Sequence, residues 1–255
     1  MMRKLLFVGA MAALLAAGTG WTQIALDPNN KWSVEWNARL GTDFPYLARY
    51  APANAALVPT PGHPRIVFMG DSITEGWVDH AGDFFTPGRI GRGIGGQTTP
   101  QMVLRFRQDV IDLHPAVVHI MAGTNDIAGN TGPMTPEQTQ ANIRSMVELA
   151  HAHGIRVILA SIPPADQFPW KPGLDVANRI AAMNAWLKAY AARSGCTYAD
   201  YWSALKQADG LGMRDGLSSD HVHPTKAGYD VMAPVAEAAI KRALAEPAPH
   251  RTAVD

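Results

Sequence analysis

The sequence contains a single cysteine, Cys196, and no block of basic residues longer than two. One thiol excludes an internal disulfide and any zinc site built from several cysteines. The 22 basic and 22 acidic side chains leave no formal net charge. Because binding to nucleic acid relies on a concentrated positive field, this balance argues against DNA or RNA as a partner. The mature protein must therefore be stabilised by a hydrophobic core, for which 47% apolar residues are sufficient.

No apolar run is long enough to span a membrane. Arg3 and Lys4 precede an apolar run over residues 5–17, and small residues follow it. A bilayer core requires about 20 apolar residues, whereas this pattern is typical of a secretory signal peptide. We therefore expect residues 1–20 to be a signal peptide and the protein to be secreted or periplasmic, with no membrane span after signal removal. An uncleaved N-terminal anchor is the alternative.

Short apolar segments alternate with longer segments of helical periodicity. Strands are predicted at residues 65–70, 89–93, 116–123, 155–162 and 197–200, and helices at residues 100–113, 135–153, 175–194 and 225–245. The strongest strands are apolar almost throughout, which is typical of parallel strands buried on both faces. This order predicts right-handed crossovers and a three-layer α/β/α sandwich. We expect residues 21–255 to form one domain with a helical lead-in over residues 28–58.

Polar residues follow the predicted strands, at the edge where parallel sheets bind ligands. Ser72 follows the first strand, Gly96 lies in a glycine-rich turn after the second, and Asn125 follows the third. A serine at a strand-to-helix turn is suited to nucleophilic attack, and backbone or amide N–H groups are suited to stabilising an oxyanion. Taken alone, each of these residues could equally be a helix cap or a turn residue.

The loop before the last predicted helix pairs a carboxylate with an imidazole. Asp220 precedes His223 by three residues, so the carboxylate can hold Nδ1 and leave Nε2 free as a base. His221 leaves open a metal site formed with these two residues, but no third neutral ligand stands nearby. Residues 91–96 fit the pattern G-x-G-x-x-G, yet they do not follow the strong first strand that a dinucleotide site requires. We therefore expect neither a metal nor another cofactor.

The four turns together resemble the sequence blocks of the SGNH hydrolases, the GDSL-type esterases and lipases. The matching segments are residues 70–72, 93–96, 123–126 and 220–224. The resemblance implies a flavodoxin-like sheet of about five parallel strands and hydrolysis of carboxylic esters through an acyl-enzyme. It implies Ser72 as the nucleophile, His223 as the base, Asp220 as its orienter, and the Ser72 and Gly96 N–H groups with the Asn125 side chain as oxyanion donors. The family usually has a small residue in place of His221, so the choice of His223 depends on the D-x-x-H spacing.

Aromatic residues near these turns indicate the substrate class. Trp77 follows the nucleophile turn and Trp170 lies in the loop over residues 163–172, and both are predicted to bind substrate. A Trp at position 77 resembles the bacterial secreted branch that is similar to carbohydrate acetylesterases. We therefore expect acetyl esters on a sugar or polysaccharide, unless these aromatics only cover the sheet edge.

Other functions are compatible with the same sequence. A longer acyl pocket would make the protein a lysophospholipase or a thioesterase, and the Asp-His-x-His segment could belong to a metal-dependent hydrolase. A secreted binding module without turnover is a further alternative. The sequence does not indicate an oligomeric state.

Overall fold

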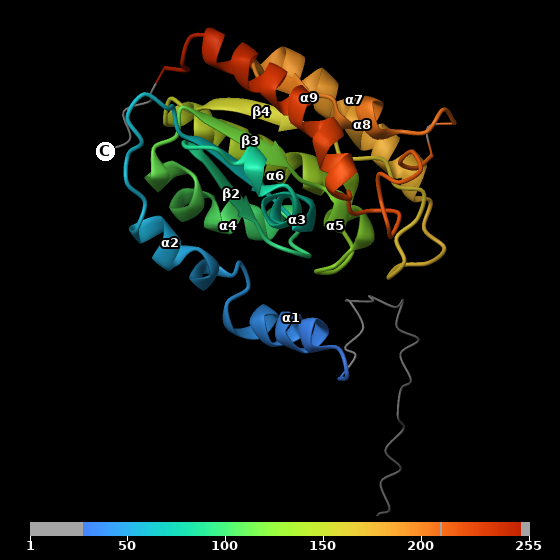
Figure 1. Ribbon diagram of the computed structural model, residues 1–255. Helices are drawn as coiled ribbons and strands as arrows, with labels where there is room; N and C mark the ends of the chain where they lie inside the picture. Colours follow the sequence, from blue (N-terminus) through green and yellow to red (C-terminus); the bar gives the residue numbers. More distant parts are fainter. Residues whose placement is uncertain (1–27, 210, 251–255) are drawn as a thin grey trace, which may run out of the picture.

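The computed structural model describes residues 28–209 and 211–250, and it places a parallel sheet between two layers of helices (Figure 1). The strands are β1 (Ile66–Gly70), β2 (Arg89–Gly93), β3 (Val117–Met121), β4 (Arg156–Ala160) and β5 (Thr197–Ala199). All neighbouring strands are parallel, in the order β2-β1-β3-β4-β5. The predicted three-layer α/β/α sandwich is therefore confirmed. The predicted signal peptide lies outside the described residues.

Helices cover both faces of the sheet. They are α1 (Lys31–Thr42), α2 (Ala51–Ala55), α3 (Ser72–His80), α4 (Thr99–Asp109), α5 (Thr124–Ala128), α6 (Pro136–Ala152), α7 (Val176–Ser194), α8 (Tyr201–Leu205) and α9 (Lys226–Ala245). Short 3₁₀ turns occur at η1 (Leu47–Arg49), η2 (Gly82–Phe84) and η3 (Ile111–Leu113). Among the helices of the described residues, none combines the length and the apolar character that a membrane span requires.

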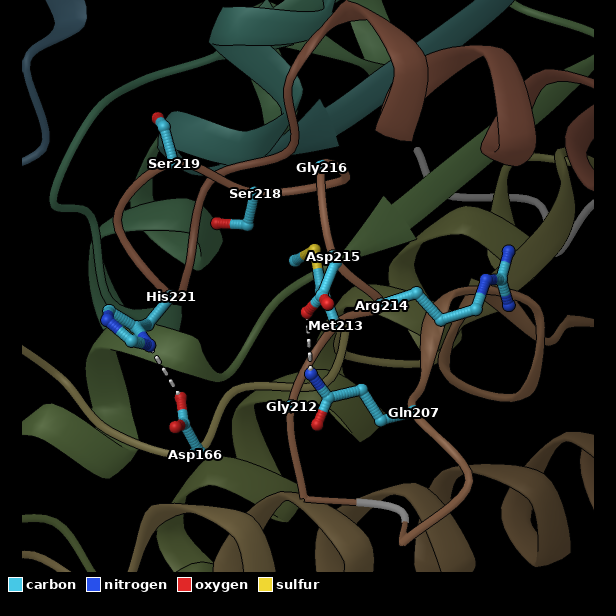
Figure 2. Close-up of a pocket in the computed structure, with 10 residues that line it drawn as sticks. All are labelled: Asp166, Gln207, Gly212, Met213, Arg214, Asp215, Gly216, Ser218, Ser219 and His221. Atoms are coloured by element: carbon cyan, nitrogen blue, oxygen red, sulfur yellow. Dashed lines mark hydrogen bonds and ion pairs between the residues drawn. The ribbon is translucent and has the colours of Figure 1, made fainter.

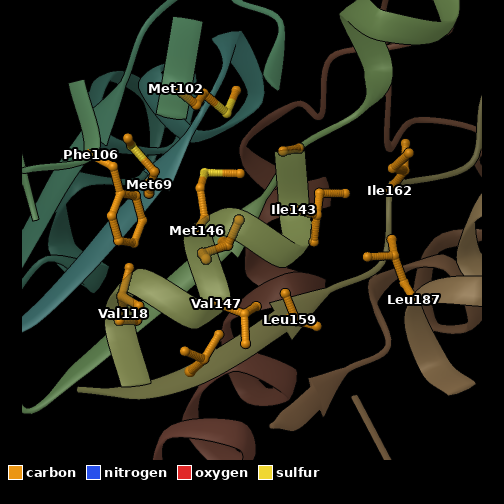
Figure 3. Packing of buried hydrophobic residues seen from close by; sticks show 14 of the residues in the cluster. Met69, Met102, Phe106, Val118, Ile143, Met146, Val147, Leu159, Ile162 and Leu187 are labelled. Carbon is orange, nitrogen blue, oxygen red and sulfur yellow. The ribbon is translucent and has the colours of Figure 1, made fainter. Parts of the chain in front are cut away.

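The two faces of the sheet bury separate hydrophobic clusters, because successive residues of a strand point in opposite directions. Val67 and Met69 of β1 pack with α4, α6 and α7, whereas Ile66 and Phe68 pack with α3, α8 and α9. Figure 3 shows part of the first cluster, including Met69, Phe106, Met146 and Leu159. Burial on both sides explains why the central strands β1, β3 and β4 are apolar almost throughout.

The N-terminal segment that precedes β1 contains α1, η1 and α2, and it is attached to α4 and to the turn before α4. Three glutamine side chains donate hydrogen bonds to its backbone carbonyls: Gln97 to Pro45, Gln101 to Phe44 and Gln108 to Leu47. Trp36 of α1 is buried, with only 2% of its surface exposed. These contacts hold α1 close to the glycine-rich turn that follows β2, which carries Gly96.

Arg105 of α4 is a fully buried cation that joins three parts of the fold. Its guanidinium donates to Asp109 Oδ2 at 3.1 Å, to Gln97 Oε1 at 2.6 Å and to the Gly70 carbonyl at 2.9 Å. It therefore connects the end of β1 to the turn after β2. Both of these segments carry residues of the candidate site.

Replacing Arg105 by methionine will remove this cation and leave the buried Asp109 carboxylate without its positively charged partner. We expect the free energy of unfolding to fall by about 3–5 kcal/mol, as is typical when one partner of a buried ion pair is removed. Urea denaturation measures the change. Arg107→Met is the matched control, because Arg107 is an exposed arginine on the same helix, and it should change stability by less than about 0.5 kcal/mol. Equal losses of unfolding free energy in the two variants would show that the buried hydrogen-bond network of Arg105 does not stabilise the fold.

Candidate active site

A serine, a histidine and an aspartate form a hydrogen-bonded chain at the carboxyl end of the sheet. Ser72 is the first residue of α3, directly after the Asp71 N-cap. Its Oγ lies 2.8 Å from His223 Nε2, and His223 Nδ1 lies 2.6 Å from Asp220 Oδ2. This arrangement allows the imidazole to take the hydroxyl proton while the carboxylate stabilises the resulting positive charge. The three residues predicted as a triad therefore lie together.

The Asp220 carboxylate organises its own loop. One oxygen, Oδ1, accepts hydrogen bonds from the backbone N–H groups of Val222 at 3.0 Å and His223 at 2.7 Å, and the other holds the imidazole. Partial burial acts to raise the pKa of Asp220, but the hydrogen bonds from His223 and Val222 outweigh it and leave the pKa below its ordinary value of 3.8. An ionised carboxylate at this position favours the tautomer in which Nδ1 carries the proton and Nε2 is free.

His221 points into a different pocket from His223. Its Nδ1 lies 3.1 Å from Asp166 Oδ1, as the dashed line in Figure 2 shows. That polar pocket is lined by residues of the loops around Asp166 and 212–221. The two histidines thus contact different carboxylates. In the part of the chain that the structure describes, no three His, Cys, Asp or Glu side chains are arranged to hold a metal ion.

Asn125 is buried beside the nucleophile turn, at the start of α5. Its Nδ2 donates to the Gln97 carbonyl at 3.0 Å and makes a long contact of 3.4 Å with Asp71 Oδ2. Its Oδ1 accepts a hydrogen bond from Asn130 Nδ2 at 2.8 Å. The Asn130 contact fixes which end of the amide is the donor. The Asn125 N–H that makes only the long contact with Asp71 is the one that can donate a hydrogen bond to a substrate oxygen.

Two backbone N–H groups complete the set of donors. Within the described ranges, no acceptor lies against the N–H of Ser72 or of Gly96. The Ser72 N–H is free because it belongs to the first turn of a helix. Gly96 has a φ of +77°, and a Cβ there would lie 2.9 Å from the Trp36 ring, so both backbone conformation and space require glycine. The N–H of the neighbouring Gly95 is not available as a donor, because it already donates to Glu75 Oε2 at 2.8 Å.

Five of the predicted site residues, Ser72, Gly96, Asn125, Trp170 and His223, line one cavity of about 330 Å³. It is lined by Trp32, Ser72, Glu75, Gly95, Gly96, Asn125, Asn130, Trp170 and His223. Trp170 lines this cavity, with its ring centroid 6.4 Å from that of His223, and it is stacked on Phe168. The Trp170 Nε1 donates to Asn130 Oδ1 at 3.2 Å, which fixes the position of the indole.

The prediction that Trp77 binds substrate is wrong. Its side chain is fully buried in the core, where it is stacked on Phe84 and Tyr229. Trp77 follows Ser72 by five residues, and five residues of helix amount to a rotation of about 140° away from the nucleophile. The indole therefore faces the sheet and not the cavity.

Outside the four predicted turns, sequence reasoning missed three residues that line the cavity: Trp32, Glu75 and Asn130. Glu75 could have been found, because it follows Ser72 by three residues and so lies on the same face of α3. Asn130 and Trp32 carry no comparable local signal. Trp32 reaches the cavity only through the packing of the N-terminal segment against α4.

Two further carboxyl groups are buried close to the site. Burial raises the pKa of Asp71 to about 6, although Asp71 Oδ1 accepts the Ile73 N–H at 3.0 Å. Burial likewise raises the pKa of Asp126 to about 6, against hydrogen bonds from the Thr99 N–H and hydroxyl. Each carboxyl thus holds backbone or hydroxyl donors in place at the start of a helix.

The comparisons with known proteins identify the family. The model of the GDSL-like lipase/acylhydrolase family matches residues 68–231, which include Ser72, Asn125 and His223. The chain belongs to this family. The resemblance to SGNH hydrolases drawn from the four sequence blocks is therefore confirmed. Helix α1 lies before the part of this acylhydrolase that the family model matches.

Solved structures resemble the acylhydrolase closely. A GDSL-like lipase from Bacteroides thetaiotaomicron is 46% identical, with a TM-score of 0.76 over 79% of this chain and 100% of that one. A structure from Bacteroides fragilis is 48% identical, with a TM-score of 0.77 over 80% of this chain and 99% of that one. Axe2, an acetylxylan esterase from Geobacillus stearothermophilus, shares the fold at 19% identity, with a TM-score of 0.54 over 72% of this chain and 94% of its own.

A curated relative gives a shorter match. The lipoprotein YqeF of Bacillus subtilis is 32% identical over 121 residues, which is 40% of this chain. The match covers 50% of YqeF, so the chain spans about half the length of that relative.

Proposed function

We propose that this acylhydrolase is a serine esterase that removes short acyl groups, acetyl above all, from a carbohydrate. The observation that carries the mechanism is the chain of hydrogen bonds from Ser72 Oγ to His223 Nε2 and from His223 Nδ1 to Asp220. Ser72 Oγ attacks the ester carbon while His223 takes its proton, and His223 then returns that proton to the leaving alcohol. Water, activated by His223 in the same way, releases the acid from the acyl-enzyme.

The negative charge that develops on the carbonyl oxygen needs donors aimed at it. The N–H groups of Ser72 and Gly96 and the Asn125 side chain line the same cavity as the nucleophile. The two backbone N–H groups have no acceptor within the described ranges, and one N–H of Asn125 makes only the long 3.4 Å contact with Asp71 Oδ2. Donors fixed in advance stabilise the transition state more than they stabilise the substrate.

Replacing Asn125 by alanine will remove one of these donors. We expect kcat to fall by about 10²- to 10³-fold, with a smaller change in KM, because the lost hydrogen bond strengthens only in the transition state. Steady-state kinetics on 4-nitrophenyl acetate measures this change. Asn178→Ala on the exposed side of α7 is the control and should match the wild type. A large rise in KM at constant kcat would assign Asn125 to substrate binding and not to the oxyanion.

The lining of the cavity supports a short acyl group. Its apolar surface is that of two indoles, and the rest of the lining is glycines and polar side chains. No aliphatic side chain among the described residues extends this apolar surface along the path of an acyl chain. A long acyl chain gains about 0.8 kcal/mol for each CH₂ only where an apolar wall buries it. We expect kcat/KM to be higher for 4-nitrophenyl acetate than for the octanoate. A preference for the octanoate would instead favour the lysophospholipase or thioesterase alternative.

A carbohydrate alcohol is supported by the aromatic and polar character of the entrance. Trp170 lies beside His223, the residue that must protonate the leaving alcohol, so this indole faces the alcohol half of the ester. Axe2, which has the same fold, is an acetylxylan esterase. The N-terminal sequence pattern and the likeness to the lipoprotein YqeF support an exported location, where polysaccharides are accessible.

A serine-directed phosphonate tests the proposal directly. The reagent should label Ser72, as mapped by mass spectrometry, and labelling should remove the esterase activity. Lack of labelling together with lack of hydrolysis of any ester would instead favour a binding module. Activity that is lost on treatment with a chelator and restored by metal would favour the metal-dependent alternative.

A further inference from the structure

The N-terminal helix α1 provides a wall of the active-site cavity, although it lies before the segment that the family model matches. The wall is Trp32, whose side chain is 44% exposed. It is stacked on Trp36, one helical turn later, with ring centroids 5.5 Å apart and an angle of 14° between the planes. Trp36 is itself buried, so one face of the Trp32 indole is supported by the fold. The exposed surface of the indole borders the cavity.

The position of the indole is set by the turn that carries an oxyanion donor. A Cβ added to Gly96 would lie 3.1 Å from Trp32 Cζ2, and one added to Gly95 would lie 3.8 Å from Trp32 Nε1. The edge of the indole therefore rests on this turn. One substrate molecule can therefore place its ester group at Ser72 and another part of itself against Trp32.

Glu75 supplies a fixed hydrogen-bond acceptor next to this surface. Arg49 donates to its Oε1 at 3.1 Å, and the Gly95 N–H donates to its Oε2 at 2.8 Å. Its side chain is 28% exposed and lines the cavity. Each carboxylate oxygen has a further lone pair, so the group can still accept a hydrogen bond from a ligand hydroxyl.

A flat indole beside a fixed acceptor matches the two chemical features of a sugar ring. A pyranose presents a flat face of C–H groups and carries hydroxyl donors around its rim. An acetyl group is too small to need such a surface. The phosphate of a lysophospholipid would face the Glu75 carboxylate, which accepts hydrogen bonds but donates none, and the Arg49 partner of Glu75 does not line the cavity. The alcohol half of a neutral carbohydrate ester is therefore the ligand that fits.

We propose that Trp32 and Glu75 form a binding subsite for a neutral pyranose ring that carries the ester. This inference rests on the proposed function, since it places the sugar in the same cavity as Ser72. It makes α1 a specificity-determining element of the enzyme. It also assigns substrate recognition to a residue outside the four sequence blocks that define the catalytic centre.

The test compares two substrates, an acetylated xylo-oligosaccharide and 4-nitrophenyl acetate. Trp32→Leu keeps apolar bulk but removes the flat ring, and we expect kcat/KM on the oligosaccharide to fall by about tenfold, mainly through KM. The loss on the aryl ester should be clearly smaller, and Trp32→Phe should restore part of the activity on the oligosaccharide. Val34→Ala is the matched control, because Val34 is an exposed residue of the same helix that does not line the cavity. It should match the wild type on both substrates, and thermal melting verifies that each variant is folded.

Equal losses of Trp32→Leu on the two substrates, or no loss on either, would overturn the subsite. Failure of the proposed function has a different signature, namely a wild type that hydrolyses neither ester. In that case calorimetric titration with the unacetylated xylo-oligosaccharide tests whether Trp32 binds a sugar. Binding by the wild type that Trp32→Leu weakens would still support the subsite, whereas equal binding by both proteins, or no binding by the wild type, would exclude it.

Discussion

Replacing Ser72 by alanine will lower kcat for acetyl ester hydrolysis by about 10⁴- to 10⁶-fold, which is the range for loss of a serine nucleophile. The Ser72 hydroxyl is the group that His223 Nε2 contacts, at 2.8 Å, so without it the imidazole has no nucleophile to activate. The fold should not change, because Ser72 is the first residue of α3 and its neighbour Asp71 makes the capping hydrogen bond. The remaining activity will reflect the oxyanion donors and binding alone.

The measurement is a progress curve with 4-nitrophenyl acetate, and the phosphonate reagent provides the control for contamination by wild-type enzyme. Ser145→Ala is the matched variant, because the Ser145 hydroxyl bonds the Ala141 carbonyl on the exposed side of α6. It should keep full activity and full labelling. Undiminished hydrolysis by Ser72→Ala would end the proposal of an acyl-enzyme on this residue.

The centre of the sheet could be predicted from the sequence because β1, β3 and β4 are buried on both faces and so carry a continuous apolar signal. Residues 65–70 and 116–123, for example, contain β1 and β3. The edge strands β2 and β5 are only partly buried and carry a weaker signal. The four polar turns could be assigned to one edge of the sheet because parallel strands all end at the same side. Local pattern and topology together therefore place Ser72, Gly96, Asn125 and His223 in one cavity, as the structure does.

The walls of the cavity were less predictable because they depend on tertiary packing. Trp77 and Trp170 both lie in segments that directly follow a strand, yet one indole faces the core and the other the cavity. Helical rotation could have excluded Trp77. The role of Trp32 could not be predicted from its sequence neighbours, because α1 reaches the turn at Gly96 through tertiary contacts. Gln101 and Gln108 of α4, and Gln97 in the turn before it, donate hydrogen bonds to the N-terminal segment.

The same packing explains why residues outside the cavity help to position the residues that line it. Arg105 donates to the Gln97 side chain, and the Gln97 carbonyl accepts the Asn125 amide. Asn130 then joins the other end of that amide to the Trp170 indole. Asn125, the proposed oxyanion donor, and Trp170, one wall of the cavity, are thus held by a single hydrogen-bonded network. A change in Arg105 should therefore lower activity as well as stability.

Replacing Asp220 by asparagine will lower kcat by about 10⁴-fold, as expected when the orienting carboxylate of a serine triad becomes an amide. The asparagine oxygen can still accept the N–H groups of Val222 and His223, so the loop should keep its conformation. The amide nitrogen would then face His223 Nδ1 and donate to it. This reverses the tautomer: the proton moves to Nε2, which can no longer accept the proton of Ser72.

Asp166→Asn is the matched control, because each of these aspartates contacts one of the two histidines in the same loop. Asp166 holds His221 at 3.1 Å, in the separate pocket of Figure 2, and Asp220 holds His223 at 2.6 Å. If His223 is the base, Asp166→Asn should keep kcat within about threefold of the wild type, a change below 1 kcal/mol in the activation free energy. The opposite pattern, with a large loss for Asp166→Asn and a small one for Asp220→Asn, would transfer the role of base to His221. The two variants therefore decide between histidines that the sequence separates only by their spacing from Asp220.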